Sequence, residues 1–185
     1  MLQFSFNPFP ILKTENLILR QISLEDATEV FEIRSNPETM KYIPRPVAET
    51  IEDAQKFIND CNASIEKNEY INWAISQKSD DKLIGMIGFF RTQPENFRSE
   101  IGYILNPDFH GKGIMKEALD EALKFGFDTM NLHSVEAVID PGNIASEKLL
   151  QKSGFEKEAH FKENFFYNNE FLDTVIYSIL KSKFQ

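Results

Sequence analysis

The sequence has a single cysteine and no long apolar segment, and these two absences exclude several kinds of protein. Cys61 alone can form no internal disulfide, and no zinc cluster can be built from cysteine pairs. No apolar run approaches the ~20 residues of a membrane-spanning helix, and the N-terminal MLQFSFNPFPILK lacks the basic-then-apolar order of a signal peptide. We therefore infer a cytoplasmic protein with no membrane partner.

Basic residues are also scarce. Twenty Lys and Arg stand against 29 Asp and Glu, which gives a formal net charge of −9. This balance disfavours nucleic acid and anionic membranes as partners but favours a cationic substrate. The three histidines are scattered and no acidic cluster has metal-ligand spacing, so we expect no metal.

Repeats, low-complexity tracts and Gly/Ser linkers are absent too, so nothing divides the chain. Its 185 residues are 42% hydrophobic and include 17 Phe, which predicts a packed core and one domain over residues 1–185. Cys61 lies at helical spacing from Ala54, Ile58 and Ile65, so we interpret it as a core residue, with a reactive thiol as the alternative.

The pattern of apolar residues and turn residues predicts an α+β fold with a mixed sheet. Three strands separated by Ser79-Asp80-Asp81 and Gln93-Pro94-Glu95-Asn96 should form an antiparallel meander. The expected strands are Asn16–Ile22, Tyr70–Ser76, Lys82–Arg91, Phe97–Leu105, Ser134–Ile139 and Phe171–Ile179. The expected helices start at Ser23, Thr50, Gly113 and Asn143, and Gly154 ends the last of them.

One loop carries a candidate binding function. His110-Gly111-Lys112-Gly113-Ile114-Met115 lies between a strand and a long helix, and its glycines would let the backbone approach a ligand. Free N–H groups at a helix start form an anion site that suits a pyrophosphate. Taken alone, the same spacing also fits an ordinary tight turn.

Three motifs together resemble the GNAT acetyltransferase superfamily, in the branch of the ribosomal-protein alanine N-acetyltransferases. The coenzyme A loop of that superfamily, Gln/Arg-x-x-Gly-x-Gly/Ala, is matched by His110, Gly113 and Met115, of which the first and third depart from the pattern. The strand motif Thr-Glu-x-Leu-x-Leu-Arg and the motif Asn-x-x-Ser-x-x-Leu-x-x-Lys-x-Gly-Phe are also present. Their residues are Thr14, Glu15, Leu17, Leu19 and Arg20, then Asn143, Ser146, Leu149, Lys152, Gly154 and Phe155.

The resemblance implies a sheet of about six or seven strands that splays open after the strand ending at Leu105, flanked by about four helices. Acetyl-CoA is the implied cosubstrate, with its pantetheine arm in the gap. The residues that the resemblance assigns to acetyl-CoA are Ile104, Leu105, Asn106, His110, Gly111, Lys112, Gly113, Ile114, Met115 and Asn143. Lys112, Lys116 and Lys148 either add charge near the phosphates or are solvated surface lysines.

Attack of an amine on a thioester needs a base, an oxyanion donor and a proton for the thiolate. Strand alternation puts Glu100 on the face of Gly102 and Ile104, so Glu100 is the candidate base, with a solvated surface carboxylate as the alternative. A backbone N–H near Leu105 is the expected oxyanion donor. Many GNAT members place a tyrosine acid where this chain has Leu150, which leaves Ser146 as the candidate acid or sulfur partner. A first-turn serine that bonds backbone groups is the other interpretation of Ser146.

These features predict an enzyme that moves an acetyl group from acetyl-CoA to a primary amine by direct attack. The resemblance suggests a protein or peptide N-terminus as acceptor. A polyamine, an amino acid or an antibiotic is the alternative acceptor, and a non-catalytic CoA-binding sensor module is the alternative from another class. A homodimer stays open, because the sequence does not fix an oligomeric state.

Overall fold

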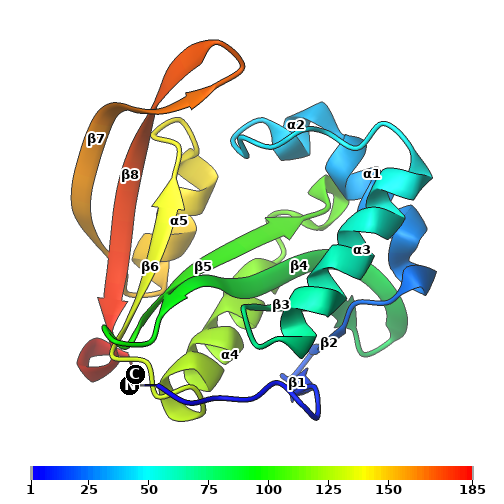
Figure 1. Ribbon diagram of the computed structural model, residues 1–185, viewed down its shortest axis with the longest axis horizontal. Helices are drawn as coiled ribbons and strands as arrows, with labels where there is room; N and C mark the ends of the chain where they lie inside the picture. Colours follow the sequence, from blue (N-terminus) through cyan, green and yellow to red (C-terminus); the bar gives the residue numbers. More distant parts are fainter. Residues whose placement is uncertain (1, 185) are drawn as a thin grey trace.

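One mixed sheet forms the centre of the structure (Figure 1), a computed structural model that describes residues 2–184. Its strand order is β1-β2-β3-β4-β5-β6-β8-β7; β5 and β6 are parallel, and the other neighbours in the described chain are antiparallel. The strands are β1 (Leu12–Lys13), β2 (Leu17–Gln21), β3 (Ile71–Gln77), β4 (Asp80–Gln93), β5 (Arg98–Leu105), β6 (Ser134–Ile139), β7 (Glu156–Tyr167) and β8 (Glu170–Leu180). The predicted fold class, a mixed and mostly antiparallel sheet with helices, is confirmed.

The described residues contain eight strands and five α-helices, slightly more than the sequence indicated. β1 has two residues and α2 (Pro37–Met40) has one turn, so neither can show a hydrophobic period. Most of β7 is exposed, and its apolar residues therefore do not alternate as they would in a half-buried strand. The other helices are α1 (Ala27–Ser35), α3 (Ile51–Glu66), α4 (Ile114–Asp128) and α5 (Ile144–Lys152).

Helices cover both faces of the sheet (Figure 1). Successive strand residues point to opposite faces, so Ala74 and Met86 pack with α1 and α3, whereas Trp73 and Ile87 pack with α4. Cys61 of α3 is buried in the first of these clusters, which confirms its core role, and burial raises the pKa of its thiol.

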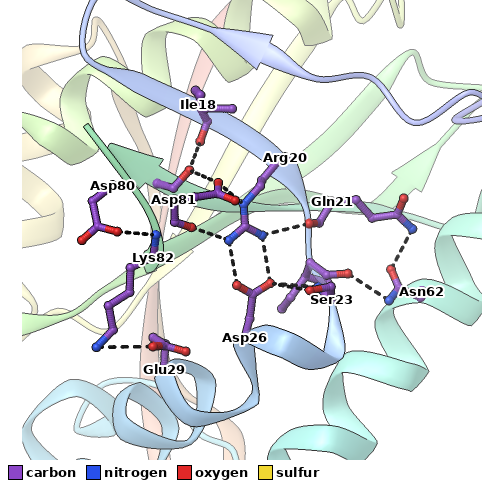
Figure 2. A network of polar contacts seen from close by, with 12 residues as sticks. Ile18, Arg20, Gln21, Ser23, Asp26, Glu29, Asn62, Asp80, Asp81 and Lys82 are labelled. Atoms are coloured by element: carbon purple, nitrogen blue, oxygen red, sulfur yellow. Dashed lines mark hydrogen bonds and ion pairs between the residues drawn. The ribbon is translucent and has the colours of Figure 1, made fainter. Parts of the chain in front are cut away.

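Arg20, the last residue of the strand motif Thr-Glu-x-Leu-x-Leu-Arg, links β2 to its neighbours. Figure 2 shows the Arg20 guanidinium held by the Asp26 carboxylate, at 2.7 and 2.9 Å, and by Asp81 of β4, at 2.8 Å. The hydrogen bond to Asp26 raises the pKa of Arg20 above its ordinary value. The same Asp26 carboxylate accepts from the Ser23 N–H at 2.8 Å, at the start of the 3₁₀ turn Leu24–Asp26 that precedes α1. Arg20 is therefore a structural residue.

The turn between β3 and β4 differs from the prediction. Gln77 pairs with Asp80, so the hairpin turn is Lys78–Ser79, and Asp80 and Asp81 belong to β4. The expected Ser79-Asp80-Asp81 turn was wrong because Asp81 is fixed by Arg20, a partner 61 positions away. The meander itself is confirmed.

The sheet opens between β5 and β6. Their parallel pairing runs only from Arg98 with Ser134 to Glu100 with Glu136, and beyond that point the strands diverge (Figure 1). The facing edges of residues 101–105 and 137–139 therefore have no strand partner across the gap. This opening lies between the strands where the resemblance implied it.

Candidate active site

The glycine loop at the start of α4 is open. Gly111 and Gly113 have φ of 72° and 79°, a left-handed conformation that glycine adopts without strain. A Cβ added at either position would have no heavy atom within 4 Å. Gly113 is the N-cap of α4 and supplies no side-chain cap, so within residues 2–184 the first-turn N–H groups of α4 have no side-chain cap. The loop can therefore accept an anion at the positive end of the helix dipole.

Side chains of the loop brace it internally. His110 Nε2 lies 3.1 Å from the Leu105 carbonyl oxygen, and Lys112 Nζ donates to the Asp108 carbonyl at 2.8 Å. The side chain of Asn106 accepts from the Asp108 N–H at 3.0 Å, at the start of the 3₁₀ turn Pro107–Phe109. His110, Lys112 and Asn106 thus shape the loop, a role that sequence spacing alone did not reveal.

The two other lysines considered for the phosphates are placed differently. Lys116 forms an ion pair with Asp120 at 2.5 Å, one turn along α4, and Lys148 is exposed on α5. A partly exposed pair of this kind contributes little to stability, so Lys116 can exchange its partner readily.

The strand motif, which begins at Thr14, also binds the start of α4. Glu117 accepts hydrogen bonds from the Thr14 hydroxyl and from the Asn16 N–H at 2.8 Å. Partial burial raises the pKa of Glu117, but the hydrogen bonds from Thr14 and Asn16 outweigh it, so that the pKa lies below its ordinary value. The sequence analysis missed Glu117, whose only signal was an acidic residue in a first helical turn.

Glu100 lies at the point where the strands part. Its strand alternates as predicted, with Ser99 and Ile101 buried, and Glu100 pairs with Phe90 on the face covered by α1 and α3. Burial raises the pKa of Glu100, and Arg91, whose Nη1 donates to Glu100 Oε2 at 2.7 Å, opposes that rise; the pKa stays above its ordinary value. The raised pKa suits a group that must take up a proton.

Arg91 was not a predicted site residue. It has a φ of 47° and lies in an irregular part of β4, between the Phe90 and Gln93 pairings with β5. Such irregularities re-aim side chains, and no simple alternation rule places Arg91 beside Glu100. Glu136, the neighbour of Glu100 across the parallel pairing, is held by Arg98 at 2.7 Å.

Ser146 lies on the other side of the opening, on α5. Its hydroxyl is 2.6 Å from the hydroxyl of Tyr103 of β5, and its backbone N–H donates to Asn143 Oδ1 at 3.1 Å. Asn143 therefore caps α5, which leaves its NH₂ group for a ligand. Leu150 is fully buried in the core. Glu100 and Ser146 thus face opposite sides of the sheet, because Ile104 packs with the α1 and α3 cluster and Tyr103 with the α4 cluster.

The Tyr42–Pro46 loop, which lies between α2 and α3, reaches the β6–α5 turn. A Cβ added to Gly142 would lie 3.2 Å from Cε1 of Tyr42. The loop therefore contacts the segment that leads from β6 into α5.

Comparison with known proteins identifies the family. Residues 16–156 match the family model described as an acetyltransferase (GNAT) domain. The chain belongs to the GNAT acetyltransferase family. This GNAT protein is 36% identical over 175 residues to the uncharacterized N-acetyltransferase YoaA of Bacillus subtilis, covering 95% of this chain and 99% of the relative. It is 24% identical to a spermidine N(1)-acetyltransferase of Vibrio cholerae, covering 91% and 95%.

Solved structures agree on the fold. A GNAT-family acetyltransferase from Bacillus anthracis superposes with a TM-score of 0.84 at 32% identity, covering 94% of this chain and 99% of the other. The ribosomal-protein-S5-alanine acetyltransferase of Vibrio fischeri superposes with a TM-score of 0.81 at 23% identity, covering 95% and 99%. The GNAT resemblance read from the three motifs is confirmed, and the protein is an N-acetyltransferase.

No helix within residues 2–184 has the length and apolar character of a membrane span. The same residues bring together no three His, Cys, Asp or Glu side chains as metal ligands. The predictions of a cytoplasmic location and of a metal-free reaction stay predictions.

Proposed function

We propose that this GNAT enzyme acetylates the N-terminal amine of a protein or peptide, by direct attack of the amine on the thioester of acetyl-CoA. The observation that carries the proposal is the opening between β5 and β6, which has an open glycine loop at one end and Glu100 at its apex. The three motifs that resemble the ribosomal-protein branch, and the similarity to the alanine acetyltransferase, support the acceptor.

The residues present fit acetyl-CoA as cosubstrate. The first-turn N–H groups of α4, with Gly111 and Gly113, offer an anion site of the kind a pyrophosphate needs. The edge of residues 101–105 that has no strand partner across the gap and the NH₂ group of Asn143 offer polar partners to an amide-containing arm. His110 and Lys112 support this site by bracing the loop.

Glu100 then accepts the proton of the attacking amine, directly or through water, from the face covered by α1 and α3. A backbone N–H near Leu105 stabilises the developing oxyanion. Ser146 approaches the sulfur from the α4 and α5 face. The two faces of the sheet thus have separate roles. The base and the acceptor lie on the α1 and α3 face, and the leaving thiol lies on the α4 and α5 face.

A polyamine is the second candidate acceptor. The net charge of −9 and the spermidine-acetylating relative favour a cationic substrate. A non-catalytic CoA-binding module is disfavoured, because the relatives that cover nearly the whole chain carry N-acetyltransferase names.

Release of CoA thiol, measured with three acceptors, tests the proposal. An alanine-initiated peptide should be turned over and gain one acetyl group at its N-terminus by mass spectrometry. The same peptide with a blocked N-terminus and an internal lysine serves as the control and should not react. Turnover of spermidine alone would overturn the peptide assignment in favour of the polyamine.

A further inference from the structure

A side-chain contact joins the two sides of the opening. Tyr103 lies three residues beyond Glu100, where β5 has already separated from β6, and Ser146 belongs to the helix that follows β6. Their hydroxyl oxygens are nevertheless 2.6 Å apart. The contact therefore lies where the proposed function places the thioester sulfur.

The contact leaves the Ser146 hydroxyl without a role in capping its helix. The Ser146 N–H donates to Asn143, and the Ser146 hydroxyl is hydrogen-bonded to the phenol of Tyr103 instead of a backbone group. Ser146 is buried, so water competes weakly for this bond. The interpretation of Ser146 as a serine that only satisfies its own turn does not explain the pair.

Tyr103 brings to the opening a phenol that α5 does not supply. The family's tyrosine position holds Leu150, one turn after Ser146, and Leu150 is fully buried in the core. The phenol comes instead from the opposite side of the opening, from β5. Burial raises the pKa of Tyr103 to about 12, against a smaller opposing effect of Ser146, so the phenol is protonated near neutral pH and can act as a donor.

We propose that Tyr103 is a positioning residue for thiolate departure: it donates its hydrogen bond to Ser146 Oγ and so directs the Ser146 hydrogen toward the CoA sulfur. This inference rests on the proposed acetyl transfer. When the C–S bond breaks, its electron pair goes to sulfur, and the Ser146 O–H stabilises the thiolate through a hydrogen bond. The thiolate leaves as such or takes its proton from water, and neither hydroxyl loses a proton.

Replacing Tyr103 by Phe removes the hydroxyl and keeps the ring. We expect the Tyr103→Phe variant to lose about tenfold in kcat, the effect of one hydrogen bond to a charged group, with unchanged KM for acetyl-CoA and a Tm lowered by about 2–4 °C, the effect of the lost Tyr103–Ser146 hydrogen bond. The matched control is Tyr177→Phe, because the Tyr177 hydroxyl also bonds to α5 but reaches the neighbouring Glu147, at 2.5 Å. This control should keep the wild-type kcat.

A double-mutant cycle separates positioning from independent action. If Tyr103 acts through Ser146, Tyr103→Phe costs nothing further in a Ser146→Ala background, and Ser146→Thr retains more activity than Ser146→Ala. Three results would overturn the proposal. The kcat loss of the double variant could equal the product of the two single losses, Tyr103→Phe could keep the wild-type kcat, or Ser146→Ala could keep the wild-type kcat. The last result decides the matter even if Tyr103→Phe fails to fold.

The kinetics use whichever of the alanine-initiated peptide and spermidine the wild-type enzyme acetylates faster. Turnover of spermidine alone contradicts the proposed acceptor and leaves the Tyr103 test intact. Turnover of the peptide together with an unaffected Tyr103→Phe variant contradicts only the role of Tyr103.

Discussion

Glu100 and Ser146 each contact a side chain that comes from another element or another part of the sheet. Arg91 reaches Glu100 from an irregular part of β4, and Tyr103 reaches Ser146 across the opening. Both candidates were identified from the sequence, Glu100 by alternation and Ser146 by its motif. Their partners were not, because a local irregularity and a contact 43 positions apart lie outside any periodic pattern.

The ion pair with Arg91 gives a prediction about pH dependence. A base must be deprotonated, so kcat/KM should rise with pH through the pKa of Glu100, which burial already places above its ordinary value. Arg91 favours the charged carboxylate, and the Arg91→Leu variant should therefore move the acidic limb of the kcat/KM profile to higher pH.

Glu100→Gln is the companion variant in this pH profile. It should lower kcat by about a hundredfold or more and abolish the limb that Arg91→Leu displaces. A Glu100→Gln enzyme with the wild-type rate and profile would remove Glu100 from the mechanism. If the acidic limb of the kcat/KM profile does not move in the Arg91→Leu variant, the group that titrates in this limb is not Glu100.

At the scale of elements, helix starts were the best predicted features. Thr50 caps α3, because its hydroxyl accepts from the Asp53 N–H at 3.4 Å, and the Thr50 N–H donates to the Asp53 carboxylate at 3.0 Å. Gly154 ends α5 with a φ of 86°. Both depend on chemistry within a few residues, which a sequence displays directly. β1, α2 and β7 were missed or undefined, since short or fully exposed elements carry no hydrophobic period.

The hydrogen bond from Thr14 of the strand motif to Glu117 of α4, here called the tether, gives a prediction at the scale of elements. The Thr14 hydroxyl donates to Glu117 on the first turn of α4, close to the glycine loop. The Thr14 hydroxyl also accepts from the Leu17 N–H at 2.8 Å. The Thr14→Val variant should therefore lower Tm by about 4–8 °C, the effect of two hydrogen bonds in a chain of this size, and weaken CoA binding because the start of α4 is less firmly held.

Thr28→Val is the control for this tether, since Thr28 is exposed on α1. Differential scanning calorimetry and a CoA titration of both variants make the comparison. Equal Tm and equal affinity in Thr14→Val and wild type would show that the tether contributes nothing to the site.

For the whole molecule, the three motifs taken together predicted the fold through the family resemblance. No single motif predicted the order of the strands in the sheet. The opening depends on β6 leaving β5 after only three paired residues on each strand. The sheet around the opening is packed on both faces, with α1 and α3 on one side and α4 on the other. The family resemblance implied the opening, and hydrophobic pattern alone did not.

The central claim is that the glycine loop and the opening beside it bind CoA, and calorimetric titration with CoA tests it most directly. Gly113→Ala should weaken binding by about tenfold, because a left-handed alanine is strained by roughly 1–2 kcal/mol and relaxes by turning the first amides of α4 away. Gly154→Ala carries the same strain in a distant turn and should bind CoA like the wild type. A wild-type protein that gives no heat with CoA, or a Gly113→Ala variant with unchanged affinity, would contradict the account.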